Sequence, residues 1–236
     1  MTDKIYEVSF QPMTSEEQKQ LANGMRNTSK LPLTDSEIEY VRSEIKRIQA
    51  DESVFVFNDP NRPHDGTCYN YEYDKIYVTK NVFPDRNYAS AHPRDIMSVA
   101  AVLAHEYYGH RFYREEYLKD KAAGNNYHTT PLWEDECRAS LRAAQMAPGL
   151  TPMERKDLVL DAVFRAQEYG QLIPMSDFMM EVVYGYSKDE RQFSKPFVLP
   201  KYVSMESQER ALRDRSDDGK MPKVRRGSRA HKDRER

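Results

Sequence analysis

An apolar run that leads into two histidines places the strongest constraint on how this chain can fold. Between Ile96 and Ala104 eight of nine residues are apolar, and His105 follows directly. A helix formed by such a run must be buried on most of its sides. We expect this helix to extend from Ile96 through Tyr117, with Pro93 in the first turn near its start. The sequence therefore predicts a central buried helix that carries histidines.

The segment His105-Glu106-Tyr107-Tyr108-Gly109-His110 has the residue types of a catalytic zinc helix. Such helices commonly provide two histidine ligands, with a glutamate beside the first as general base. Their usual spacing of four residues keeps both imidazoles on one face, whereas five residues would splay them by about 140°. Both histidines can reach one ion only if a π-bulge absorbs the additional residue. Gly109 is the residue best able to accept the distorted backbone.

A second group of polar residues begins the next predicted helix: Trp133-Glu134-Asp135-Glu136-Cys137-Arg138-Ala139-Ser140. Three acidic residues in a row also occur simply because negative charge favours a helix N-terminus. However, 26 residues separate His110 from Glu136, which is enough for the first helix to end and a second to return beside it. From spacing alone, both interpretations stay open.

The two motifs together resemble those of the dipeptidyl peptidase III family of zinc exopeptidases. That family has His-Glu-x-x-Gly-His and, downstream, Glu-Glu-Cys-Arg-Ala-Glu. The resemblance implies that His105, His110 and Glu136 bind one Zn²⁺ and that Glu106 is the general base. It also implies that Asp135 does not bind the metal itself but orients a histidine ligand. The resemblance covers roughly residues 100–145, and the family's enzymes are much larger and two-lobed, so only the metal site is carried over.

We therefore expect a zinc metallopeptidase that hydrolyses peptide bonds through a zinc-activated water, with Glu106 as general base. The developing oxyanion needs a further hydrogen-bond donor. Candidates are His128 and Tyr127, before the second motif, and Tyr184 and Tyr186 further on, although a structural role is the alternative for each. The run Lys75 to Thr79 is the expected sheet edge for a peptide substrate.

Other polar side chains near these motifs have simpler expected roles. Arg138 is expected to pair with an acidic side chain of the protein, and Cys137 to be a small buried residue. His64 and His92 are expected to lie at the surface.

The predicted fold class is α+β, a compact zincin-like domain. A small antiparallel sheet would pack on the central bulged metal-binding helix, with further helices around it. Thr34 with Glu37, and Thr151 with Glu154, have the spacing of capping boxes. We expect a loosely packed segment over residues 1–33, the metallopeptidase domain over 34–204 and a charged, disordered tail over 205–236. Strands are predicted near 53–58, 68–73 and 75–79, and helices at 34–50, 132–147, 152–170 and 176–186.

Composition bounds the class of protein and its partners. Two cysteines, Cys68 and Cys137, do not suggest a disulfide framework, and no run reaches the roughly 18 apolar residues of a membrane span, so a cytoplasmic protein without membrane contact is expected. Glu206 to Arg236 contains 11 Lys/Arg and 7 Asp/Glu, a charge of +4. A basic tail could contact nucleic acid or an acidic partner, but its interspersed acids weaken this interpretation.

The sequence is also compatible with three other functions. One is a non-catalytic module that keeps a structural zinc, for which a carboxylate at Glu106 would not be needed. Another is a hydrolase of non-peptide amides. The last is an adaptor that works through the basic tail, with incidental histidines.

Overall fold

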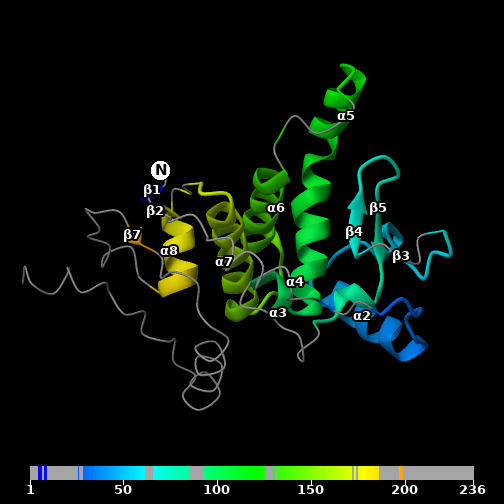
Figure 1. Ribbon diagram of the computed structural model, residues 1–236. Coiled ribbons are helices and arrows are strands. Elements are labelled where there is room, and N and C mark those ends of the chain that lie inside the picture. Colours follow the sequence, from blue (N-terminus) through cyan, green and yellow to red (C-terminus); the bar gives the residue numbers. More distant parts are fainter. Residues whose placement is uncertain are drawn as a thin grey trace, which may run out of the picture.

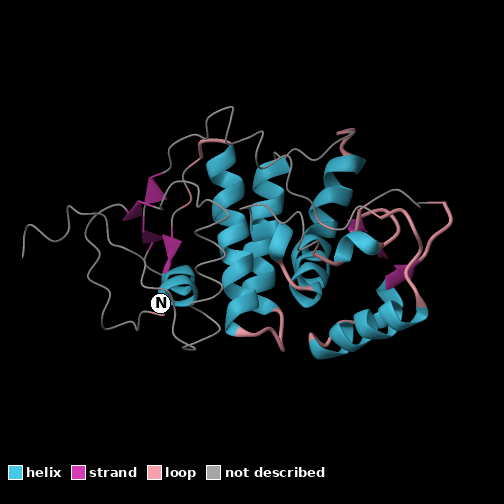
Figure 2. Ribbon diagram, turned by 60° about the horizontal axis from the view of Figure 1, so that its bottom comes forward, coloured by secondary structure: helices cyan, strands magenta, loops and turns pink. Residues whose placement is uncertain are grey.

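The structure, a computed structural model, describes residues 5–6, 8–9, 26, 29–61, 66–84, 93–125, 130, 132–171, 173, 175–185 and 197–198. Helices make up most of this part of the chain, with strands to either side of them (Figure 2). The helices are α2 (Asp35–Arg47), α3 (Pro93–Ile96), α4 (Val99–Ala104), α5 (Arg114–Ala122), α6 (Leu132–Met146), α7 (Pro152–Glu168) and α8 (Asp177–Tyr184). A π-helical turn, η3 (His105–Gly109), and a 3₁₀ turn, η4 (His110–Tyr113), join α4 to α5, and two further 3₁₀ turns are η1 (Glu52–Val54) and η2 (Lys80–Val82).

A continuous rod of α4, η3, η4 and α5 stands at the centre of the fold (Figure 1). Helices α6 and α7 lie along one side of it, and the three-stranded sheet lies on the other. All six residues of α4 are buried, as expected for a helix without a polar face, whereas α5 projects beyond the body and buries none of its residues. The rod therefore changes from core to surface along its length, and the two histidines lie at the transition.

The start of this rod differs from the predicted single helix. Pro93 does begin a helix, as predicted, but α3 ends at Ile96. Ser98 then caps α4 by accepting a hydrogen bond from the amide of Ala101 at 3.1 Å. A serine directly before an apolar run is an N-cap signal, and here it divides the helix in two.

The three-stranded sheet has the order β3-β5-β4, formed by β3 (Phe55–Phe57), β5 (Lys75–Val78) and β4 (Cys68–Asn70). Strands β4 and β5 are antiparallel, with Tyr69 opposite Ile76, but β3 runs parallel to β5, with Phe55 opposite Ile76. The predicted purely antiparallel sheet is therefore wrong. The hairpin between β4 and β5 leaves two free edges, and β3 pairs in parallel with the edge formed by β5.

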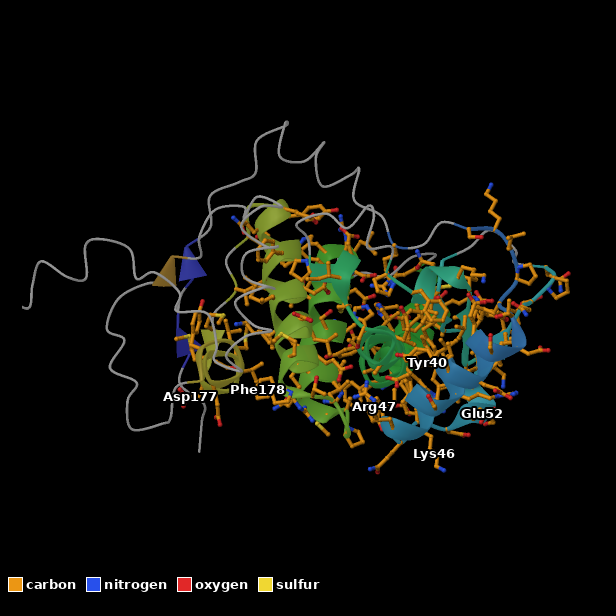
Figure 3. The ribbon with its side chains drawn as sticks, turned by 90° about the horizontal axis from the view of Figure 1, so that it is seen from below. Tyr40, Lys46, Arg47, Glu52, Asp177 and Phe178 are labelled. Atoms are coloured by element: carbon orange, nitrogen blue, oxygen red, sulfur yellow. The ribbon has the colours of Figure 1, made fainter. Side chains whose placement is uncertain are left out.

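The remaining predicted helices are confirmed, with their caps. In α2 and α7 the threonines before the helix, Thr34 and Thr151, form capping boxes with Glu37 and Glu154. Arg47, labelled in Figure 3 where α2 approaches the other helices, pairs with Glu154 at 2.6 Å and so ties α2 to the start of α7. Glu154, the capping carboxylate of α7, thus also holds α2 against the start of α7.

Several of the described residues among the first 33 contact later parts of the chain. Strand β1 (Ile5–Tyr6) pairs with β6 (Met175–Ser176), and β2 (Val8–Ser9) pairs with β7 (Phe197–Val198). The guanidinium of Arg26 donates four hydrogen bonds of 2.5–3.0 Å, all to main-chain carbonyls. These carbonyls belong to Asn81, Val82, Arg94 and Met97. Arg26 is thus tied to the segments around η2 and α3. Most of the segment predicted to be loosely packed, and the whole predicted tail from residue 205, lie outside the described residues.

Within the described residues, no helix has both the length and the apolar character needed to cross a membrane.

Candidate metal centre

The backbone absorbs the additional residue between the histidines at the predicted place. From His105 to Gly109 the helix widens to a π-helical turn, and regular helical geometry returns in α5. The two imidazoles consequently share a face, and their Nε2 atoms lie 3.0 Å apart. The bulge is what makes a five-residue spacing compatible with one metal ion.

Gly109 has a packing role that the sequence did not reveal. A Cβ atom at this position would lie 2.5 Å from the carbonyl oxygen of Ala139, on α6. The missing side chain thus lets α6 approach the rod closely. Because α6 carries Glu136, this approach brings the third ligand candidate, which is acidic, close to the two histidines.

His105, His110 and Glu136 form a group that could hold a metal ion. The Nε2 atoms of His105 and His110 are 3.3 and 3.6 Å from the two carboxylate oxygens of Glu136. Tetrahedral coordination with bonds of about 2.0–2.1 Å places ligand atoms about 3.3 Å apart, so these separations, which involve both oxygens of Glu136, are close to those that one ion requires. Both histidines are buried and Glu136 is partly exposed, which leaves one side of the group open.

The Nε2 atom of His110 faces His105 and Glu136, and its other ring nitrogen, Nδ1, contacts a tyrosine and a carboxylate. The Nδ1 atom lies 2.9 Å from the hydroxyl of Tyr71 and 3.3 Å from Asp135, and Tyr71 donates to Asp135 at 3.2 Å. The structure thus places Asp135 where a histidine-orienting residue belongs. Burial alone would lower the pKa of His110, but hydrogen bonding to Asp135 and Glu136 outweighs it and raises this pKa to about 10. The surroundings favour positive charge at this imidazole.

The corresponding nitrogen of His105, which faces away from the other ligand candidates, contacts Ser140 instead. Its Nδ1 atom lies 2.8 Å from the Ser140 hydroxyl, which donates to Asp161 on α7 at 2.5 Å. Arg165, one turn further along α7, binds both Asp161 and Glu136. Neither Asp161 nor Arg165 was identified from the sequence, although two opposite charges four residues apart within an apolar stretch are the signal of an internal pair.

Glu106, the predicted general base, is buried beside this group. Among the described residues, only the amide of Tyr69 donates to its carboxylate, binding Oε2 at 2.8 Å. Burial raises the pKa of Glu106. One carboxylate oxygen is thus fixed by the sheet, and Oε1 remains available for other chemistry.

The group opens into a cavity of about 610 Å³. Its wall includes both histidines, Glu106, Glu136 and Tyr71, and also Leu132, a residue that is 70% exposed. A cavity of this size is in the range of pockets that enclose a small ligand or a short peptide segment.

The predicted substrate edge at Lys75 to Thr79 is wrong, because β5 is the central strand of the sheet. Strand β4 is the edge nearest the metal group, and the amide of Tyr69 on this strand already donates to Glu106. Next to the strand, the amide of Thr67 donates to Asn81 and the carbonyl of Tyr71 accepts from Arg114. A peptide strand that paired with these groups would have to displace these bonds.

Other candidates from the sequence lie elsewhere. Arg138 pairs with Glu116 of α5 at 2.7 Å, which confirms an internal partner, and buried Cys137 donates to the carbonyl of Ala162. Tyr184, at the end of α8, does not border the cavity. The predictions for His64, His92, Tyr127, His128 and Tyr186 fall outside the described residues.

Comparisons of the chain with known protein families, curated proteins and solved structures found no match. The resemblance to dipeptidyl peptidase III therefore stays a prediction that rests on the two motifs.

Proposed function

We propose that this protein is a zinc-dependent metallopeptidase of zincin-like type that cleaves peptide bonds in the cavity beside His105 and His110. One observation carries the proposal. A buried carboxylate, Glu106, lies next to a preformed His-His-Glu group and has one oxygen held by a main-chain amide. A structural metal site has no use for this additional acid, whereas a hydrolytic site needs it as general base.

The proposed metal is Zn²⁺, because two histidines and one glutamate are a common set of protein ligands at catalytic zinc. When bound, the ion would supply Lewis-acid polarisation of the scissile carbonyl and of water. Glu106 would accept a proton at Oε1, while the Tyr69 amide keeps Oε2 in place, and would pass that proton to the leaving amine. Peptide or protein is the proposed substrate, and the cytoplasmic location inferred from the cysteines stays a prediction.

Metal analysis of purified protein tests the metal centre. We expect one zinc per chain in the wild type and in Glu106→Gln, and loss of zinc in Glu136→Ala, because of these two glutamates only Glu136 is a proposed ligand. Freshly purified wild-type protein without stoichiometric metal would contradict the proposal.

Digestion of a peptide library then tests the reaction. Losing the general base should lower cleavage by about 10²–10⁴-fold in Glu106→Gln, while zinc content stays unchanged. Equal cleavage by both proteins would rule out Glu106 as the base. Stoichiometric zinc without cleavage by the wild type would favour a non-catalytic zinc-binding module.

A further inference from the structure

We propose that Asp161 and Arg165 on α7 are positioning residues of the metal centre, which join the ligands His105 and Glu136 in one closed ring of contacts. The ring is defined as His105, Ser140, Asp161, Arg165 and Glu136. The inference rests on the metal-binding part of the proposed function. It adds two residues from a helix that contains neither motif.

Every step of the ring is a short polar contact. From His105 Nδ1 the distance to Ser140 Oγ is 2.8 Å, and from there to Asp161 Oδ2 it is 2.5 Å. Arg165 Nε binds both oxygens of Asp161 at 2.9 and 3.0 Å. Arg165 Nη1 is 3.0 Å from Glu136 Oε2, and that oxygen is 3.3 Å from His105 Nε2.

The chemistry of the groups determines which atom donates in the first half of the ring. Both oxygens of Asp161 bind the guanidinium of Arg165, which can only donate, so this carboxylate acts as an acceptor. The Ser140 hydroxyl must therefore donate to Asp161, and its oxygen is left to accept the N–H at Nδ1 of His105. With the proton at Nδ1, Nε2 carries the free electron pair that faces Glu136 and would bind the ion.

The second half of the ring controls the acidic ligand. Arg165 cannot accept a hydrogen bond and stays charged, so it holds Oε2 of Glu136 from the α7 side. The side chain of Asp161 in turn fixes the guanidinium through two contacts. One carboxylate thereby sets both the protonated nitrogen of His105 and the orientation of Glu136.

Stability alone does not explain this arrangement. Asp161 and Ser140 are fully buried, and a buried ion pair is often no more stabilising than apolar side chains of similar size. In contrast, groups hydrogen-bonded behind metal ligands typically change metal affinity by about 10–100-fold when they are removed. In the ring, Ser140 contacts the ligand His105 and Arg165 contacts the ligand Glu136, so groups of this kind support two ligands at once.

The test compares Asp161→Asn with a matched control on the same helix, Glu154→Gln. Glu154 also binds an arginine and a serine hydroxyl, Arg47 and Ser98, but contacts no ligand. Zinc affinity of the metal-free protein is measured by competition with a chelator, and thermal unfolding is measured in parallel. We expect about 10–100-fold weaker zinc binding in Asp161→Asn and unchanged affinity in Glu154→Gln, although both variants lose stability.

A second variant covers the case in which Asp161→Asn does not fold. Ser140→Ala removes the acceptor at His105 Nδ1 but leaves the pair of Asp161 and Arg165 intact, so it should fold and still bind zinc more weakly. Wild-type affinity in Ser140→Ala, or in folded Asp161→Asn, overturns the positioning role and leaves the proposed function standing. Failure of the wild type itself to bind zinc would overturn both.

Discussion

Replacing Gly109 with alanine adds a single methyl group at the closest approach between the rod and α6. Its Cβ would lie 2.5 Å from the carbonyl oxygen of Ala139 and 2.8 Å from that residue's Cα and carbonyl carbon. All three are main-chain atoms of a helix, so no side chain can rotate away. The helix as a whole must therefore retreat.

The size of this movement follows from contact distances. Ordinary contact begins at 3.4 Å and the tightest tolerable contact is 3.0 Å, so α6 must move away by about 0.5 to 0.9 Å from the present separation of 2.5 Å. Glu136 lies one turn before Ala139 and moves with it. Metal sites tolerate about 0.2 Å in ligand distance, so we expect at least about tenfold weaker zinc binding. Overpacking should also lower the free energy of unfolding by about 1–3 kcal/mol.

Chelator competition on the metal-free variant measures zinc affinity, and urea unfolding measures stability. Gly149→Ala is the control, because its Cβ would meet the carbonyl oxygen of Arg47 and Gly149 has a left-handed φ of +69°. This control should lose stability but keep wild-type zinc affinity, since α6 is not pushed away from η3. Wild-type zinc affinity in folded Gly109→Ala would refute the reasoning.

Two further results are expected. Removing metal with a chelator should lower the unfolding temperature of the wild type and leave that of Glu136→Ala unchanged, because only a protein that binds the ion gains stability from it; equal shifts in both proteins would contradict this. Burial acts to raise the pKa of Glu154, but hydrogen bonds from Arg47, Ser98 and Thr151 outweigh it and lower this pKa to about 2, from 4.5 in an unfolded chain. The folded pKa is depressed, so this carboxylate stabilises the fold fully above pH 4.5 and loses its contribution as the pH falls from 4.5 to 2. Urea unfolding at a series of pH values should show a shallower loss over this window in Glu154→Gln, and identical slopes would count against the assignment.

The features that could be predicted from the sequence are those set by near neighbours in the chain. The bulge follows from a five-residue histidine spacing, and the capping boxes follow from pairs three residues apart. The break before α4 has a local signal as well, because Ser98 is an N-cap residue directly before an apolar run. Local rules of this kind depend on helix geometry, which is the same in every protein.

Contacts between distant segments were not accessible in the same way. Three short strands of similar composition permit several orders, and the parallel pairing of β3 with β5 depends on how the hairpin is placed. Ser140 and Asp161 are 21 residues apart in the chain, and they meet only because α6 and α7 pack together. The pairing of charges within α7 was visible in the sequence, but the ligand that Arg165 reaches was not.

The bulge at η3 also sets the helical phase of everything that follows it. Arg111 reaches Asp74, Arg114 reaches the carbonyl of Tyr71, and Tyr117 stacks on the ring of Tyr71, all on the hairpin between β4 and β5. Deleting Tyr108 would restore the usual four-residue histidine spacing and a regular helix. It would also turn these three side chains by about 100° away from the hairpin. The bulge that brings His105 and His110 to one face thus also directs the side chains of η4 and α5 toward the sheet. Deleting Tyr108 would keep the histidines on one face but break the contacts with the hairpin.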